Sequence, residues 1–282
     1  MTEKTARVKK AKPFKKLRFT FTRRWFSAPY VLFIIAFIVA PMAVMIFRAF
    51  TATSGGFTMD NFAAFFKDAV ALKALWQSLL IALVSTLACL LIGYPIAYIM
   101  AQTKTFKNPY ILILLFILPM WINFLLRITA LKELFELLSV VPGPDSWGLV
   151  VMGMVYDFLP FMILPLYNSL SKMDKNYLEA ASDLGANKAQ VFIKAVIPLS
   201  MPGIMSGITL VFVPVISAYA IAEAMSNNSI RMFGWHLNEI AMQGSVNQAA
   251  AMAIAASLFI VAMILISSRY ERVGGESGGT ML

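Results

Sequence analysis

The chain has 282 residues and is strongly apolar: 60% of them are hydrophobic, 13% are charged, and the mean hydropathy is +0.75. A soluble domain carries about 25% charged residues, so this composition excludes an ordinary globular core. The net charge of +10 does not indicate a nucleic-acid partner, because 10 of the 24 basic residues lie in the first 24 positions. A basic block just before an apolar segment is typical of contact with anionic lipid head groups.

Six apolar segments are long enough to cross a bilayer, which takes about 20 helical residues. In chain order they cover residues 29–47, 75–101, 110–131, 148–170, 203–225 and 249–267. Backbone groups that face lipid have no water to bond, so each span has to be helical. We therefore expect an all-α, polytopic membrane helix bundle with about six transmembrane helices. Prolines are expected to kink several of them: Pro41, Pro95, Pro119, Pro160, Pro165 and Pro214.

The basic residues predict the orientation of the bundle. If the N-terminus lies in the cytoplasm, the cytoplasmic segments carry 18 lysines and arginines and the external segments carry 6. The positive-inside rule then places both termini in the cytoplasm. The expected organisation is a basic tail over residues 1–28, a transmembrane domain over 29–268 and a second tail over 269–282.

The external segment between the first two spans predicts one more helix. Phe62, Phe65 and Phe66 follow the i, i+3, i+4 spacing of a helical face. We expect a short amphipathic helix that lies at the outer membrane interface.

The connection over residues 171–202 carries the clearest helix signals outside the spans. Asp174 can cap a helix N-terminus, and Gly185 stands where a left-handed C-terminal glycine belongs. Asn187 can cap a second helix. The pattern predicts two short helices around a glycine turn, projecting into the cytoplasm. They form either a docking element for another protein or an ordinary solvated loop.

One motif in this loop has a specific spacing: Glu179, Ala180, Ala181, Gly185, Ile197 and Pro198. It resembles the EAA loop of binding-protein-dependent ABC importer permeases, although that family usually has leucine before the proline. The resemblance implies that the loop is a coupling helix seated on an ATPase subunit. The coupling residues would be Glu179, Ala180, Ala181, Asp183, Gly185 and Pro198.

The resemblance extends over about residues 29–268 and implies the type I ABC importer permease (MetI-like) fold. The stretches 91–95, 118–123, 159–167 and 198–204 are similar to B-type permeases of spermidine/putrescine importers. Permeases for ferric iron, sulfate or similar solutes share parts of these patterns, so another solute stays open as an alternative.

The same resemblance implies the partners and the location. They are an ABC ATPase dimer, a second permease subunit of the C type, an extracytoplasmic polyamine-binding protein and membrane lipid, in the bacterial cytoplasmic membrane. The sequence has no G-x-x-x-x-G-K-[ST] phosphate loop. We therefore expect no cofactor on this chain, with ATP and Mg used by the partner ATPase.

Two acidic residues inside predicted spans are candidates for the path of a cationic substrate. Asp157 lies near the middle of the fourth span, and Glu223 lies near the outer end of the fifth. A polyamine needs carboxylates for its ammonium groups and aromatic faces beside them. Aromatic and polar residues that could contribute are Trp121, Asn123 and Tyr219. The alternative is a structural ion pair, in which Arg127 neutralises Asp157 or Glu223.

Other classes of protein are disfavoured. The only histidine, His236, stands in an external loop, so neither a metal site nor a histidine-based catalytic constellation is expected. A secondary transporter is the remaining alternative. It is less favoured because the sequence has no evident internal repeat and a coupling-type loop has no role there.

Overall fold

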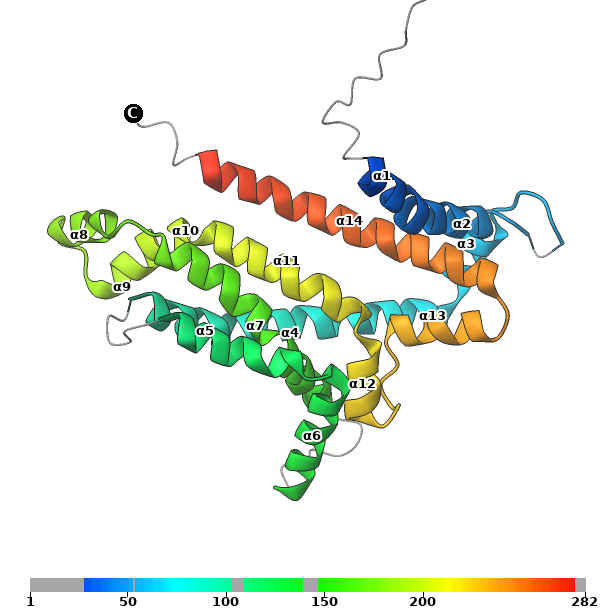
Figure 1. Cartoon of the computed structure of the whole chain (residues 1–282), viewed down its shortest axis with the longest axis horizontal. Coiled ribbons are helices and arrows are strands. Elements are labelled where there is room, and N and C mark those ends of the chain that lie inside the picture. Colours follow the sequence, from blue (N-terminus) through cyan, green and yellow to red (C-terminus); the bar gives the residue numbers. More distant parts are fainter. Residues whose placement is uncertain (1–27, 53, 103–108, 139–146, 277–282) are drawn as a thin grey trace, which may run out of the picture. The chain divides into compact units, whose positions relative to one another are not determined.

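The computed structural model describes residues 28–52, 54–102, 109–138 and 147–276. The chain divides into two compact units, Met1–Met45 and Ile46–Leu282. Most of the expected basic tail over residues 1–28, and residues 277–282 of the expected C-terminal tail, lie outside the described residues. Every regular element in the described ranges is a helix (Figure 1).

The first unit contains most of the first expected span, which ends two residues past its boundary at Met45. Its helices α1 (Ala28–Ile34), η2 (Ile35–Val39, a π-helical stretch) and the start of α2 (Ala40–Ala49) follow one another without a break. Residues Pro29–Ala49 form a 21-residue apolar helix with a hydropathy of 2.7, and none of its most apolar 18-residue window is buried. An apolar helix that is exposed on all sides is suited to lipid.

The second unit is a helical bundle. Its helices in chain order are α3 (Asp60–Lys67), α4 (Ala69–Gln102), α5 (Pro109–Ile117), η3 (Leu118–Trp121), α6 (Phe124–Leu137), α7 (Trp147–Ser171), α8 (Lys175–Asp183), α9 (Lys188–Val191), η4 (Phe192–Val196), α10 (Ile197–Leu199), α11 (Met201–Ser217), α12 (Tyr219–Ser226), α13 (Phe233–Met242) and α14 (Val246–Glu276). Helix α14 continues past the expected boundary of the membrane domain at residue 268.

Helices α4, α7 and α11 pack against one another and form the centre of this unit. Small residues allow their close approach, as is common between membrane helices. A Cβ atom added at Gly93 of α4 would lie 3.2 Å from Cγ of Met162, and one added at Gly203 of α11 would lie 2.8 Å from the carbonyl oxygen of Pro165. The buried core here includes Ile81, Val150, Met154, Met162, Leu166 and Val211.

A second, smaller core joins α3 to α13 and α14. The predicted external helix is present as α3, and its Phe65 is buried 6.1 Å from the ring of Phe233. Met252 of α14 completes this core. Phe62 is half-buried, whereas Phe66, which the spacing places on the same face, is 64% exposed, so the predicted apolar face of α3 is only partly buried.

Two expected spans are not single continuous helices. The third is broken between Trp121 and Phe124, where the two parts meet at 96°. Pro119 lies in the 3-10 turn before the break, and the Asn123 side chain accepts a hydrogen bond from the Leu125 amide at 2.9 Å, which starts a new helix. The polar residue in this apolar run is therefore a helix cap.

The fifth expected span ends early, at Ser217. The Ser217 hydroxyl donates to the Pro214 carbonyl at 3.0 Å, and the Ala218 amide donates to Val215 instead of continuing the helix. Helix α12 then begins at Tyr219. A further bend of 63° separates Lys188–Leu199 from Met201–Ser217.

The described helices fit about six membrane segments. Three helices are long and apolar enough to cross a bilayer, and up to five spans result if each bent pair is one span. The apolar part of α14, Val246–Ala262, is a shorter helix in the place of the sixth expected segment.

Candidate functional site

The loop that carries the EAA-like motif is folded as its sequence predicts. The Asp174 side chain accepts a hydrogen bond from the Asn176 amide at 3.0 Å and caps α8. Gly185 has φ +83°, a left-handed conformation that suits glycine. Asn187 and Gln190 form a reciprocal capping box with two hydrogen bonds of 2.9 Å at the start of α9.

Helix α8 presents a mixed surface with little packing of its own. Glu179, Ala180 and Asp183 are exposed, and Ala181 is half-buried. Beside these residues, Leu184 is 90% exposed and Tyr177 is 62% exposed. Pro198 lies apart from α8, in the short helix α10. The small and apolar side chains of α8 make a surface that a partner can cover.

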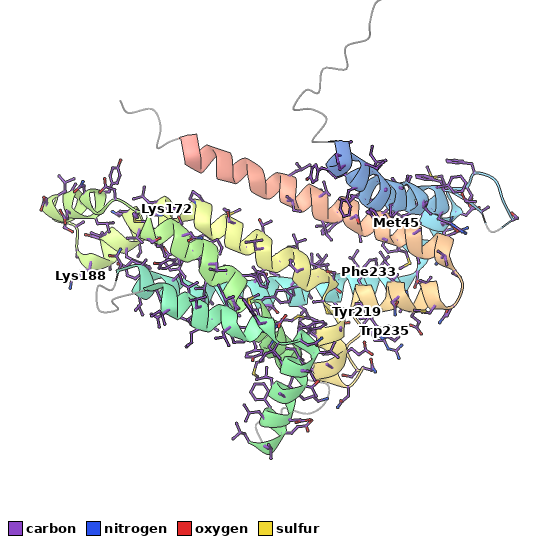
Figure 2. All side chains as sticks on the ribbon, viewed as in Figure 1. Met45, Lys172, Lys188, Tyr219, Phe233 and Trp235 are labelled. Carbon is purple, nitrogen blue, oxygen red and sulfur yellow. The ribbon has the colours of Figure 1, made fainter. Side chains whose placement is uncertain are left out.

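The two ends of the second unit carry different candidate residues. Figure 2 shows Lys172 and Lys188 at the end that holds α8 and α9, with Tyr219 and Trp235 toward the other end. The α8–α9 loop and Tyr219, which starts α12, therefore lie toward different ends of this unit.

Asp157 is engaged in a buried ion pair. Its Oδ1 atom accepts a hydrogen bond from Nη2 of Arg127, and Asp157 and Arg127 are 7% and 9% exposed. The guanidinium group also lies 5.9 Å from the ring centroid of Tyr156. This arrangement is the structural ion pair that the sequence left open as an alternative, and it attaches α6 to α7.

Lys132 holds the end of α12, a role that the sequence did not suggest. Its Nζ atom donates to the Ala224 carbonyl at 3.0 Å and to Oδ1 of Asn227. Asn227 has φ 51° and ends α12 in the left-handed conformation. A cation at this place compensates the carbonyls that a helix C-terminus leaves without partners.

Glu223 lies half-buried on α12, and no cation among the described residues forms an ion pair with it. The ion pairs among the residues that the structure describes are Arg127–Asp157 and His236–Asp68, and Glu223 belongs to neither. Of the basic residues of α6, Arg127 pairs with Asp157, and the Lys132 ammonium donates to the Ala224 carbonyl and to Asn227 at the end of α12. Of the two predicted acidic candidates, Glu223 is therefore the one without an ion pair among the described residues.

The remaining path candidates lie on different elements. Trp121 is 89% exposed at the break of the third expected span, and Asn123 is the cap of α6. Tyr219 starts α12 one turn before Glu223, and its ring packs so closely on Gly234 that a Cβ there would lie 2.9 Å from Cδ1 of the ring. Tyr219 and Glu223 share helix α12, four residues apart.

A pocket of about 270 Å³ lies near the same end, between the start of α4 and α13. Its lining includes Val70, Lys73, Ala74, Gln77, Ser229, Arg231, Trp235, His236 and Glu239. The Arg231 guanidinium lies 4.3 Å from the ring centroid of Trp235. Two exposed basic residues, Lys73 and Arg231, therefore flank a pocket with an aromatic wall.

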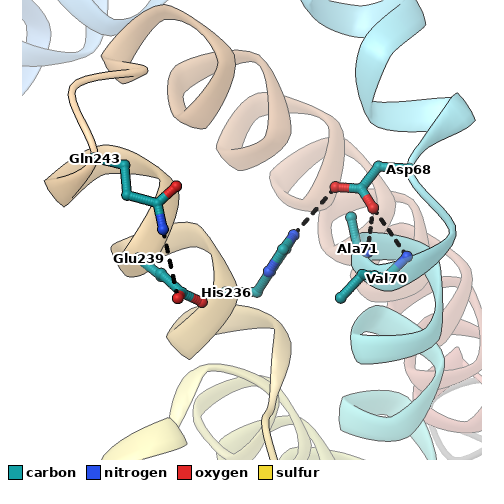
Figure 3. A network of polar contacts seen from close by, with 6 residues as sticks. All are labelled: Asp68, Val70, Ala71, His236, Glu239 and Gln243. Atoms are coloured by element: carbon teal, nitrogen blue, oxygen red, sulfur yellow. Dashed lines mark hydrogen bonds and ion pairs between the residues drawn. The ribbon is translucent and has the colours of Figure 1, made fainter.

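His236 is fixed beside this pocket by Asp68, as Figure 3 shows. Its Nε2 atom lies 3.2 Å from Oδ2 of Asp68. The other carboxylate oxygen of Asp68 accepts from the Val70 and Ala71 amides at 2.9 and 3.2 Å. Burial raises the pKa of Asp68, but these hydrogen bonds and the imidazole outweigh it, so the pKa lies below its usual value of 3.8.

Residues 6–273 match the family described as "Binding-protein-dependent transport system inner membrane component". The spermidine/putrescine transport system permease protein PotB of Salmonella typhimurium (strain SL1344) is 40% identical over 192 residues, which cover 63% of this chain and 66% of that protein, just under two thirds. A PotB homolog of Mycoplasma genitalium is 30% identical over 258 residues, which cover 88% of this chain and 90% of that protein.

A solved structure shares the fold. It is described as a bacterial ABC transporter involved in the import of the acidic polysaccharide alginate, and it superposes with a TM-score of 0.70 at 14% identity, covering 88% of this chain and 94% of that one. The chain therefore belongs to the family of binding-protein-dependent transport system inner membrane components, as a multi-pass membrane permease of an ABC importer and not an enzyme.

Proposed function

We propose that this chain forms half of the translocation pathway of an ATP-driven importer of polyamines such as spermidine and putrescine. The observation that carries the substrate class is Glu223, a half-buried carboxylate without a cation among the described residues. A carboxylate in a membrane segment is costly unless it is paired, so a cationic substrate is a natural partner for it. The two PotB relatives, named for spermidine and putrescine transport, support the same class.

Fewer carboxylates remain for the proposed substrate path than the sequence suggests. Arg127 neutralises Asp157, and we assign to this pair the task of holding α6 on α7. Glu223 then receives an ammonium group of the substrate. Tyr219 on the same helix supplies an aromatic face for cation–π contact.

Helix α8 is proposed to dock on a separate ATPase dimer that binds ATP and Mg. Its exposed Tyr177 and Leu184 provide apolar surface, and Glu179 and Asp183 provide charge on one side. In the proposed cycle, closure of the ATPase dimer moves α8, the bundle opens outward to accept the substrate, and hydrolysis resets it. A second permease subunit, a C-type homologue, completes the pathway.

The orientation that fits this cycle has both termini and α8 in the cytoplasm. The pocket beside α13 then faces outward, where a polyamine-binding protein docks. Lys73 and Arg231 flank this pocket and suit acidic side chains of that protein.

Reversing both charges, with Lys73→Glu and Arg231→Glu, should weaken the binding protein's affinity and its salt dependence. Unchanged affinity in a direct binding titration would reject this docking site.

The test of the function is radiolabelled uptake in cells that lack this chain and are re-supplied with wild type or Glu223→Gln. Spermidine, putrescine, ferric iron and sulfate are compared. The matched control is Glu133→Gln, which removes an exposed carboxylate from α6. We expect polyamine uptake alone to depend on the chain and Glu223→Gln to abolish its recovery. Loss of iron or sulfate uptake with unchanged polyamine uptake would overturn the substrate assignment.

A further inference from the structure

The segment after the α8–α9 loop is attached to α4 inside the bundle. Elements η4 and α10 lead from α9 to Ser200, where the chain bends by 63° into α11. Ser200 is fully buried, and its hydroxyl lies 2.8 Å from Oη of Tyr94 on α4. These two residues are 106 positions apart in the sequence, so their hydrogen bond is a tertiary connection.

The direction of this hydrogen bond follows from its neighbours. The Ser200 hydroxyl donates its proton to the Ile197 carbonyl at 3.0 Å. With the Ser200 proton directed to that carbonyl, Tyr94 donates to the Ser200 oxygen, which keeps a lone pair for it; either hydroxyl has the geometry to donate. Tyr94 is 9% exposed, and a buried hydroxyl that loses its partner carries a desolvation cost.

A second attachment lies a few residues earlier. The ring of Phe192, the first residue of η4, packs edge-on against two rings of α4. Its centroid is 5.7 Å from that of Tyr94 at 88° and 5.2 Å from that of Tyr98 at 84°. Tyr94 and Tyr98 are four residues apart and share one face of α4. Phe192 and Ser200 thus both contact the same face of α4.

These two contacts with α4 are connected to the proposed coupling helix α8 through the elements between them. Helix α8 contacts η4, and η4 contacts α10. The π-helical turn of η4 and the bend at Ser200 are the irregular parts of this path, and π-helical turns inside helices are frequent at functional sites. Helix α4 is a central element of the bundle through its packing on α7 and α11.

We propose that Tyr94 and Ser200, with Phe192, form the joint through which movement of α8 is passed to α4. These are positioning residues: they contact neither ATP nor substrate, and they hold the loop segment and α4 together while α8 moves. This inference rests on the proposed function, since it requires an ATPase partner. The alternative is that the hydrogen bond only satisfies two buried hydroxyl groups.

The experiment uses the complex of this chain with its ATPase and second permease, reconstituted in proteoliposomes with the binding protein and radiolabelled spermidine. The measured quantity is spermidine taken up per ATP hydrolysed. Tyr94→Phe removes the donor and keeps the ring against Phe192. We expect the ratio to fall about fivefold, which corresponds to one hydrogen bond of about 1 kcal/mol.

Two further variants separate the joint from a general structural effect. Tyr98→Phe removes a hydroxyl from the same face of α4, where no side-chain partner of that hydroxyl is found in the described ranges, and should leave the ratio unchanged. Ser200→Ala should lower the ratio as Tyr94→Phe does, and the double variant should be no worse than either single one, because both remove the same bond.

The outcomes are distinguishable. If wild-type complex shows no ATP-dependent spermidine uptake, the proposed function fails. If wild type transports, and Tyr94→Phe and Ser200→Ala keep the wild-type ratio per assembled complex, the joint is rejected. Lower assembly with an unchanged ratio also rejects it, because that result assigns the hydrogen bond to stability alone.

Discussion

Arg127 and Asp157 face each other on α6 and α7 with almost no exposure. Each charge in such a place depends on the other, because an unpaired buried charge has no solvent to stabilise it. We predict that Arg127→Met or Asp157→Asn lowers the free energy of unfolding by about 3–5 kcal/mol. Thermal unfolding of the purified protein in detergent measures this loss.

The swap Arg127→Asp with Asp157→Arg is the control for the same pair. It restores opposite charges and should recover part of the lost stability. Single variants that unfold at the wild-type temperature would show that the pair contributes nothing to the attachment of α6.

The lowered pKa of Asp68 leads to a prediction about how stability depends on pH. Its pKa lies below 3.8 in the folded chain, so folding favours the ionised form. The stability that Asp68 contributes is present above about pH 3.8 and is lost as the pH falls through the folded pKa. We expect Asp68→Asn to be less stable than wild type at pH 7, with the difference shrinking below about pH 3.8. A series of unfolding midpoints from pH 7 to pH 3 tests this, and a difference that stays constant contradicts it.

The residue assignments succeeded where the signal was local. Asp174, Gly185 and Asn187 were assigned from their neighbours, and each has the predicted role. Lys132 could not be assigned in this way, because its partners Ala224 and Asn227 lie 92 and 95 positions away. Its role depends on how α6 folds back on α12, which no sequence window contains.

At the scale of the elements, the breaks in the third and fifth spans were the least predictable feature. A hydropathy window averages over about 20 residues, and one cap or one hydroxyl does not change that average. Asn123 is a candidate for the substrate path in the sequence, and in the structure its side chain caps α6. Helix α11 ends at Ser217, where the Ala218 amide donates to the Val215 carbonyl and the helix does not continue. At both positions the local hydrogen bonding interrupts the helix, although the surrounding residues are apolar.

The contact between α11 and α7 leads to a prediction about packing. A methyl group at Gly203 would lie 2.5 Å from Cβ of Ser169 and 2.8 Å from the Pro165 carbonyl oxygen, and a backbone atom cannot yield easily. We expect Gly203→Ala to lower the free energy of unfolding by about 1–3 kcal/mol, as overpacking does. Gly148→Ala on α7 is the matched control, since nothing lies within 4 Å of its added methyl group.

Thermal unfolding of the two alanine variants in the same detergent decides this prediction. If Gly203→Ala and Gly148→Ala unfold together, the approach of α11 to α7 is looser than these distances indicate. If only Gly203→Ala is destabilised, the small residue is needed for the central packing of α4, α7 and α11.

At the scale of the whole molecule, composition and charge predicted the class of fold, and the family match confirms it. The reason is that a bilayer allows few solutions: apolar helices of sufficient length, with charges kept between them. The substrate path was harder to predict. Asp157 and Glu223 are both acidic residues inside apolar runs, and only the tertiary position of Arg127 distinguishes them.

The separation of the two ends of the second unit allows the last prediction. Glu179 is exposed on α8, so Glu179→Lys should leave folding and membrane insertion intact, since exposed substitutions change stability by about 0.5 kcal/mol or less. It reverses a charge on the surface proposed to meet the ATPase. We expect ATP hydrolysis to continue in reconstituted complex while spermidine uptake is lost.

Glu136→Lys makes the same charge reversal at an exposed position of α6, near the other end. It should leave the dependence of uptake on ATP hydrolysis unchanged, even if a changed external charge alters the apparent affinity for a cationic substrate. Normal uptake by Glu179→Lys would reject the coupling role of α8. Equal loss of uptake per ATP hydrolysed in both variants would show a general effect of charge, because α8 would then have no special place in the cycle.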